Sequence, residues 1–381
     1  MLRAEFVDSI DAISSSQWCQ LFPNSNPFTN HKYLLALEQS GSVGGKSGWL
    51  AQHWLLWRND SLIAAAPNYI KLHSYGEYLF DWAWAEAYQR HGLDYYPKLL
   101  CAIPYTPSTG ARIGLAKGEA LEPVVRAFSD SMQQRAQQLG ASNAQLLFGS
   151  DRLQQALSQQ GWLARREIQF HWHNNQYQHF EQFLARLTAR KRKNIVKERQ
   201  RVHASGMSIK VVSGHQIDNA MWQRFYHCYH TTYLKRANRP GYLSLQFFQQ
   251  LGTTMPDNIV MIAAFDNQQK LLAAALCLRD DTTLYGRYWG ALVDIPGLHF
   301  ELCYYQGIEY CIKHGLRRFD PGAQGEHKIA RGFEPTWVYG AALLFDSPFA
   351  DAIDNYCRQE LQLLQQRMNQ LNASLPFKQS R

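Results

Sequence analysis

The sequence predicts an α+β protein made of two similar units, each with a mixed central sheet flanked by helices. The first observation is a pair of apolar runs within residues 53–70, separated by a polar turn, which is typical of a β-hairpin. The second is that the same pattern returns within 258–278. In both copies the second run starts with Leu, an aliphatic residue and three alanines, at 62–66 and at 271–275. The repeat indicates a duplicated supersecondary unit.

Each hairpin is followed by a helix and a further strand. Helical spacing covers 121–139 and 300–314, and a glycine ends each helix, Gly140 in one copy and Gly315 in the other. Short apolar strands follow at 144–148 and 316–320, and a third strand at 283–289 extends the later copy. We therefore expect a first unit over residues 1–175 and a second over 176–381.

A strongly basic segment opens the second unit. Residues 180–204 lack Pro and Gly and predict a long helix, either continuous or broken near Thr188, before a strand at 207–212. Such a helix could neutralise phosphate groups, or it could be an ordinary solvated face. A second amphipathic helix at 351–371 is expected to close the chain. The cations of the basic segment are Arg186, Arg190, Lys191, Arg192, Lys193, Lys197, Arg199 and Arg201.

Composition bounds the class of protein. With 46% hydrophobic and 18% charged residues, the 381-residue chain can bury a core and is not a disordered polyelectrolyte. Its net charge of +8 permits an anionic partner without requiring one. The seven cysteines form no C-x-x-C pair, which argues against a disulfide framework or a Cys-rich zinc site. No signal peptide and no bilayer-length apolar run is found, so we expect a cytoplasmic protein without an integral membrane segment.

The first candidate site lies in the aromatic segment 73–107. Tyrosines and tryptophans alternate there with charged residues, a composition that suits a pocket for an amphipathic substrate, although an aromatic core is the alternative. We expect Glu77, Asp81, Tyr96 and Lys98 to line this pocket.

The second candidate site lies between 286 and 331. Asp320 falls at a strand end and Glu301 in the first turn of a helix, and a glycine-bearing loop follows Asp320. The alternative is a surface loop with a capped helix. The further polar and aromatic members of this group are Arg287, Tyr288, Trp289, His327, Lys328 and Arg331.

Other chemistries have less support. His171 with His173, and His227 with His230, have metal-ligand spacing, but no third ligand is evident and we expect no metal. The signatures of serine hydrolases, P-loop proteins and zincins are missing from the sequence.

Five segments, at 26–43, 73–99, 286–290, 299–312 and 319–333, resemble a bacterial family of predicted N-acyltransferases, also called peptidoglycan biosynthesis/recognition proteins. That family is related to the Fem-type peptidyltransferases and to the wider GNAT superfamily. The resemblance covers nearly the whole chain and implies two tandem GNAT-like, Fem-like units. The stretch 190–206 is similar to the helix that opens the second unit in such enzymes.

The resemblance also implies the type of reaction. Fem-type enzymes transfer an aminoacyl group from charged tRNA to an amine of a cell-wall precursor, and ordinary GNAT members use acyl-CoA. The pyrophosphate loop of the latter, [QR]-x-x-G-x-[GA], has an incomplete counterpart here, because the string that starts at Arg287 ends in Leu292. The donor, acyl-CoA or aminoacyl-tRNA, therefore stays open, and we expect it as a co-substrate rather than a bound cofactor.

The hypothesis is transfer of an acyl or aminoacyl group to an amine-bearing small molecule or peptide, linked to cell-wall metabolism. Its alternative is a catalytically silent GNAT-like module that binds a peptidoglycan precursor, a peptide or tRNA. In the first case Glu301 or Asp320 would be the base or would orient the amine. His327 would shuttle protons. Tyr288 and Trp289 would line the channel. The groups expected to hold phosphate or another anion are Lys328, Arg287, Arg331, Arg190, Lys191, Arg192 and Lys193.

Overall fold

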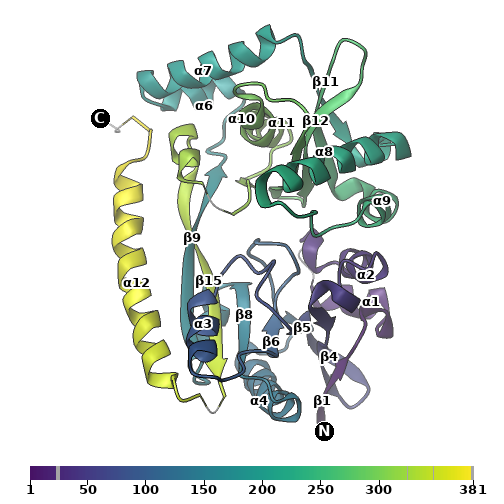
Figure 1. Cartoon of the computed structure of the whole chain (residues 1–381), viewed down its shortest axis with the longest axis vertical. Helices are drawn as coiled ribbons and strands as arrows, with labels where there is room; N and C mark the ends of the chain where they lie inside the picture. The colour runs from purple at the N-terminus through teal and green to yellow at the C-terminus, as the bar shows by residue number, and fades with distance from the viewer. Residues whose placement is uncertain (23–25, 324, 346, 379–381) are drawn as a thin grey trace. The chain divides into compact units, whose positions relative to one another are not determined.

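The computed structural model describes residues 1–22, 26–323, 325–345 and 347–378 (Figure 1). Internal contacts divide the chain into two compact units. Unit 1 comprises Met1–Ile168 and Trp337–Arg367, and unit 2 comprises Gln169–Thr336 and Met368–Arg381. These bounds differ from the predicted ones, 1–175 and 176–381, because residues 169–175 lie in unit 2 and residues 337–367 lie in unit 1. The latter belong to unit 1 because strand β15 (Glu334–Leu344) pairs there with β8 (Asn143–Gly149).

Unit 1 contains a small sheet of order β1-β3-β4-β7 and a larger set of strands in the order β15-β8-β6-β5-β2. The hairpin predicted at 53–70 is present, but its second strand is interrupted at Pro67, which lacks the N–H that a continuous ladder needs. β4 therefore belongs to the small sheet and β5 to the larger set. The remaining bounds are β1 Leu2–Val7, β2 Trp49–Ala51, β3 His53–Arg58, β4 Ser61–Ala66, β5 Asn68–Lys71, β6 Lys98–Cys101 and β7 Gly114–Leu115.

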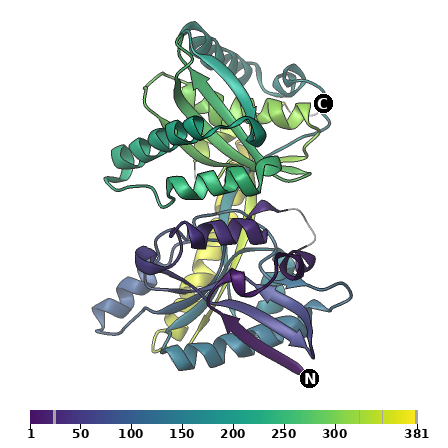
Figure 2. The same cartoon turned by 90° about the vertical axis from the view of Figure 1, so that its right-hand side faces the viewer.

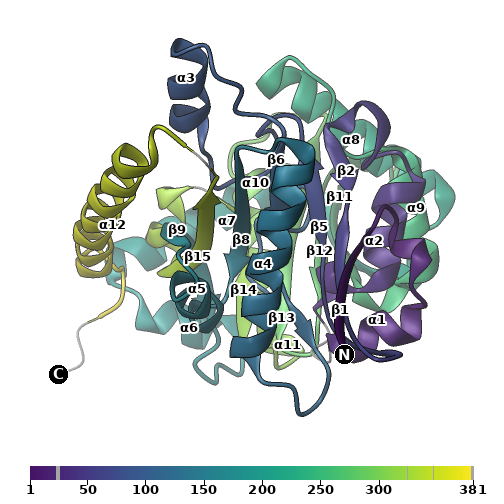
Figure 3. The same ribbon diagram turned by 90° about the horizontal axis from the view of Figure 1, so that it is seen from below.

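Helix α4 (Leu121–Leu139) packs against β6 and β8 and ends at Gly140, as predicted (Figure 3). Its Phe128 and Met132 belong to one buried core with Leu99 and Leu146. The opposite face of β6 and β8 carries Lys98 and Gln145 instead, because side chains alternate along a strand. The other helices of the unit are α1 Ser15–Leu21, α2 His31–Gln39, α3 Trp82–Arg90 and α5 Asp151–Ser158, with 3-10 turns at Ile10–Ala12, Pro27–Thr29 and Gly45–Ser47.

Unit 2 has the strand order β10-β11-β12-β13-β14-β9. All neighbours are antiparallel except β13 and β14, which run parallel. Helix α8 (Asn219–Ala237) packs on β12 and β13 (Figure 2). The strand bounds are β9 Leu163–His173, which begins in unit 1, β10 Ser208–Ser213, β11 Ile259–Phe265, β12 Leu271–Arg279, β13 Thr283–Ala291 and β14 Arg318–Asp320.

Two predicted helices differ in detail. The basic segment is broken near Thr188, giving α6 (Phe180–Arg186) and α7 (Ala189–Ala204), and Leu187 between them forms a β-bridge with Phe377. The helix expected at 300–314 starts earlier and contains a π-helical segment: α10 Leu298–Phe300, η6 Glu301–Tyr305 and α11 Gln306–Lys313. The other elements are α9 Leu245–Thr254, the closing helix α12 Ala350–Ala373, and 3-10 turns at Gly214–Gln216, Pro256–Asn258 and Glu326–Arg331.

The predicted internal repeat is visible in the strand register. Leu62 pairs with Trp57 in unit 1, and Leu271 pairs with Phe265 in unit 2, with a register shift beside each pair. In each copy the register shift skips one residue, Ile63 in unit 1 and Leu272 in unit 2. The backbone oxygen of each skipped residue accepts a hydrogen bond, that of Ile63 from Ala116 N–H and that of Leu272 from Leu292 N–H. The last strand of each unit comes from the other half of the sequence: β15 completes unit 1 and β9 completes unit 2.

Candidate functional site

The first candidate site lies in unit 2, where the parallel strands β13 and β14 separate. They pair from Thr283 to Tyr285 against Arg318 to Asp320. Beyond that point β13 has a register shift, with Gly286 and Tyr288 paired to consecutive residues of β12. Arg287 is the extra residue of this bulge, directly after the stretch that pairs with β14. Bulges re-aim side chains in this way next to functional sites.

Asp320 is the centre of the site. One of its oxygens, Oδ1, accepts hydrogen bonds from Arg287 Nη2 at 2.9 Å and from the backbone N–H of Gly322 at 2.9 Å. The same oxygen lies 3.8 Å from Nε2 of His171, on β9. The three side chains are each 2% exposed. A carboxylate, a guanidinium and an imidazole are thus buried together at a strand end.

Neither ring nitrogen of His171 has a hydrogen-bond partner among the described residues. Burial lowers the pKa of His171 to about 4, although Asp320 acts in the opposite direction. The imidazole is therefore neutral near pH 7 and can accept a proton. Sequence reasoning considered His171 only as a metal ligand, and nothing local in the sequence places it beside Asp320.

Lys328 approaches the loop that follows Asp320. Its Nζ donates to the backbone oxygens of Gly322 at 2.7 Å and Ala323 at 3.3 Å. Burial lowers the pKa of Lys328 to about 8, against the attraction of Asp320. An ammonium group with this pKa can donate a proton in the neutral range.

A group of cations surrounds the start of the helix formed by α10, η6 and α11. His299 follows Gly297, which has a φ of 91°, and its ring lies 5.2 Å from that of Trp289. Burial, then Arg236, His327, Lys328 and Arg331, lower the pKa of His299 to about 4. This helix start, with its backbone N–H groups and neighbouring cations, suits a phosphate or another anion.

Two of these side chains, His327 and Arg331, are held in place by neighbouring residues. His327 Nε2 lies 2.9 Å from the hydroxyl of Tyr304. Arg331 stacks 3.5 Å from the centre of the Phe300 ring and forms a 2.8 Å ion pair with Glu198 of α7. Through this ion pair, Arg331 also links α7 to the rest of unit 2.

Glu301 has bonding partners different from those of Asp320. It is fully buried, and its two oxygens accept hydrogen bonds from Arg199 at 3.0–3.2 Å and from Gln306 at 2.8 Å. Arg199 also binds Glu309, at 2.8 Å. This geometry makes Glu301 part of an ion-pair network between α7 and the π-helical segment, which favours Asp320 over Glu301 as the group that meets an amine.

The remaining predicted residues of this region lie in three places. Tyr288 is buried, with its ring 5.3 Å from Phe248 and 6.0 Å from Tyr229. Trp289, the next residue along the strand, instead contacts His299. Arg190 and Lys193 are exposed on α7, whereas Lys191 and Arg192 are half-buried there.

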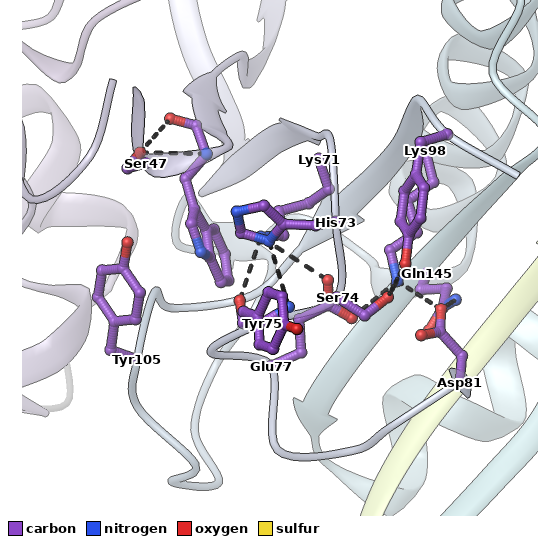
Figure 4. Close-up of polar contacts among 12 residues, drawn as sticks. Ser47, Lys71, His73, Ser74, Tyr75, Glu77, Asp81, Lys98, Tyr105 and Gln145 are labelled. Carbon is purple, nitrogen blue, oxygen red and sulfur yellow. Dashed lines mark hydrogen bonds and ion pairs between the residues drawn. The ribbon is translucent and has the colours of Figure 1, made fainter. Parts of the chain in front are cut away.

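The second candidate site lies in unit 1 (Figure 4). Lys98 of β6 and Lys71 of β5 are directly paired across the sheet. The ammonium of Lys98 donates to Ser74 at 2.9 Å, to Glu77 at 2.8 Å and to Asp81. Gln145 donates to the same Asp81 oxygen at 2.6 Å. The predicted residues Glu77, Asp81 and Lys98 thus form one buried cluster, and Tyr96 joins it through a 2.9 Å hydrogen bond to Ser74.

Burial shifts the pKa values of two charged residues in this cluster, Glu77 and Lys71. Burial raises the pKa of Glu77 to about 7, although Lys98 opposes the change. Burial also lowers the pKa of Lys71 to about 7. The Lys71 ammonium donates to the backbone oxygen of Tyr75 at 3.3 Å, rests 3.8 Å over the Trp49 ring and lies 3.9 Å from Glu77. Sequence reasoning missed Lys71, Ser74 and Gln145, which join the cluster through tertiary contacts.

Among the described residues, no group of three or more His, Cys, Asp or Glu side chains could hold a metal ion. In the same part of the chain, no helix is both long and apolar enough to cross a bilayer.

The family model FemAB-like, described as peptidoglycan biosynthesis/recognition, matches residues 9–379. The chain belongs to the FemAB-like family. No curated protein matches it in sequence. The match confirms the predicted relationship to Fem-type proteins.

Solved structures share the fold of this FemAB-like protein. A crystal structure of FemX is 13% identical, covers 90% of this chain and 98% of its own, and gives a TM-score of 0.54. The structure of L-PGS from Bacillus licheniformis is 9% identical, covers 91% and 97%, and gives 0.51. A tandem GNAT protein from the clavulanic acid biosynthesis pathway is 10% identical, covers 90% and 98%, and gives 0.49. The predicted α+β class, with mixed sheets flanked by helices, is confirmed.

Proposed function

We propose that this FemAB-like protein transfers an acyl or aminoacyl group to a primary amine, with the reaction at Asp320 in unit 2. The observation that carries the proposal is the buried group of Asp320, His171 and Arg287 at the point where β13 and β14 separate. Family membership supports the class of reaction and its link to peptidoglycan.

The chemistry follows from the groups present. An ammonium acceptor is attracted by the Asp320 carboxylate, and the Arg287 and Gly322 donors keep that carboxylate in place. The bound ammonium first gives one proton to the Asp320 carboxylate. The neutral amine nitrogen then attacks the carbonyl carbon of the donor, which forms the new C–N bond. The nitrogen of the new bond is positively charged and therefore acidic, and the neutral imidazole of His171 would accept its second proton. The C–S or C–O bond to the leaving group then breaks, and Lys328 would supply the proton that the leaving group needs.

The donor is proposed to be acyl-CoA or aminoacyl-tRNA, both of which carry phosphate. The cations around His299, together with the start of the helix at Leu298, would hold that phosphate. An amine-bearing small molecule or peptide is the proposed acceptor.

The test is turnover by the purified full chain, followed by mass spectrometry, with either donor and a set of amines that includes muropeptides. Asp320→Asn and His171→Gln should each lower kcat by roughly 100-fold or more, the usual contribution of a positioned acid or base. His173→Gln is the matched control, because His173 lies on the same face of β9 but is only partly buried, and it should stay within a few-fold of the unmodified protein. Full activity of Asp320→Asn would disprove the assignment.

Lys328→Met tests the proposed proton donor separately. It should lower kcat more with an oxygen ester as the donor than with a thioester, because an alkoxide leaving group needs the proton more than a thiolate does. An equal loss with both kinds of donor would contradict the role of Lys328 as the acid.

The second candidate function is a silent binding module. The ion pair between Arg287 and Asp320 favours it, because this pair already occupies one oxygen of the carboxylate that would meet the amine. Tight binding of a muropeptide, a peptide or tRNA without turnover by any donor would support it.

A further inference from the structure

Helix α7 has two faces with different roles. Its inner face is fixed to unit 2 by buried Ile195 and Val202 and by the ion pairs of Glu198 and Arg199. Because the inner contacts fix the rotation of the helix about its axis, they also determine which side chains point to solvent.

The outer face of α7 carries Arg190, Lys193, Lys197 and Arg201, all exposed. At 100° per residue these positions fall within an arc of roughly 80°, and at 1.5 Å per residue they extend over about 16 Å. None of the four side chains has an ion pair or a hydrogen bond with the residues that the structure describes. Sequence reasoning grouped eight cations together, whereas the structure separates these four from Arg199, which is paired inward.

Two further exposed cations lie near the first residues of α7. Arg186 ends α6, and its backbone oxygen accepts a hydrogen bond from the backbone N–H of Lys378 at 2.9 Å. Arg186 and Lys378 therefore lie together at the start of α7, and both are exposed. We call these six residues the α7 cationic face.

We propose that the α7 cationic face binds the surface of a bilayer that contains anionic phospholipid. Four exposed cations along α7, with Arg186 and Lys378 beside its first residues, suit a layer of phosphate headgroups, and clusters of four to eight Lys or Arg are typical of this kind of binding. Val196, 37% exposed on the flank of the face, adds an apolar group at the same surface.

Nucleic acid is the rival partner, and the composition of the helix favours it less. Proteins that hold single strands without sequence preference combine cations with aromatic side chains on which bases stack. Residues 189–204 contain no Phe, Tyr or Trp. The surface of one helix is also convex, so it offers no groove around a strand.

The test is flotation of the full chain with vesicles of phosphatidylcholine, with or without phosphatidylglycerol. We expect binding only when phosphatidylglycerol is present, and release by added salt. Lys193→Glu combined with Lys197→Glu should reduce the bound fraction at least tenfold. The matched control is Lys270→Glu with Lys313→Glu, which makes the same change of net charge at exposed positions elsewhere in unit 2 and should still bind.

Three outcomes would overturn the proposal. One is equal loss of binding in both double variants, which would show a response to net charge alone. Another is binding that is unchanged in Lys193→Glu/Lys197→Glu. The third is binding of RNA, lost in that variant, with no binding to either vesicle at the same salt, which would make the face a nucleic-acid surface. Thermal unfolding of each variant establishes that it is folded.

Discussion

Gln145 in unit 1 and Asp320 in unit 2 occupy the same position of the repeated sheet. Each lies five residues after the glycine that ends the preceding helix, and each is paired in parallel with the neighbouring strand, Gln145 with Leu100 and Asp320 with Tyr285. Unit 1 therefore has an amide where unit 2 has a carboxylate. An amide can neither attract an ammonium nor take its proton, which is why the proposed reaction is assigned to unit 2.

Lys98→Met should lower the free energy of unfolding by about 3–5 kcal/mol, because Glu77 and Asp81 would lose the cation that they share in a buried site. Urea denaturation measures the change. Lys117→Met, at an exposed position of the same unit, is the control and should change stability by less than about 0.5 kcal/mol. A similar small effect for both variants would contradict the burial of the Lys98 charge.

Glu77→Gln should change how stability depends on pH. The pKa of Glu77 rises from 4.5 to about 7 on folding, so the folded protein binds more protons than the unfolded chain between these values. The free energy of unfolding of the unmodified protein should therefore fall as pH rises through this range, by up to about 1.4 kcal/mol per pH unit from this group, and Glu77→Gln should remove that slope. Urea titrations at several pH values test it, and parallel curves for the two proteins would refute it.

Lys71→Met should act in the opposite sense at higher pH. The pKa of Lys71 falls from 10.5 to about 7 on folding, so above pH 7 the unfolded chain binds more protons. Stability from this group should thus rise with pH between about 7 and 10.5, and the variant should lack the rise. The same titrations, continued to alkaline pH, decide the point, and Lys117→Met should keep the slope of the unmodified protein.

Arg199→Met and Glu301→Met should be strongly coupled in stability. Burial by itself would lower the pKa of Arg199, yet the hydrogen bonds of Glu309 and Glu301 raise it above its ordinary value. A double-mutant cycle should give an interaction energy of about 2 kcal/mol, typical of residues in one buried network. Additive effects would mean that Glu301 is not a structural partner of Arg199 and would restore it as a candidate base.

Gly290→Ala should destabilise unit 2 by about 3 kcal/mol or more. A Cβ at Gly290 would lie 2.2 Å from the backbone of Cys228 and Tyr229 in α8, and a helix backbone cannot move away without losing its contacts with the sheet. Gly286→Ala on the same strand is the control, since its Cβ would meet atoms no closer than 3.3 Å. Equal stability of the two variants would contradict the close approach of α8 to β13.

The local elements followed from the sequence alone. Hairpin patterns and the helices ended by Gly140 and Gly315 depend on neighbouring residues, and the repeated Leu-aliphatic-Ala-Ala-Ala string indicated the duplication. The break near Thr188 was one of two alternatives that the sequence left open. Within the candidate sites, Glu77, Asp81 and Lys98 lie close enough along the chain for composition to suggest a cluster.

Only the tertiary structure decided which distant residues meet. His171 lies beside Asp320 because β9 pairs with β14. Glu301 forms an ion pair with Arg199 because α7 packs against the helix that carries Glu301. Strand pairing and helix docking join residues more than 100 positions apart, and periodicity contains no information about which partner is chosen. The sequence thus determined the repeated elements and the kinds of chemical group available, whereas packing determined which of those groups are paired with each other.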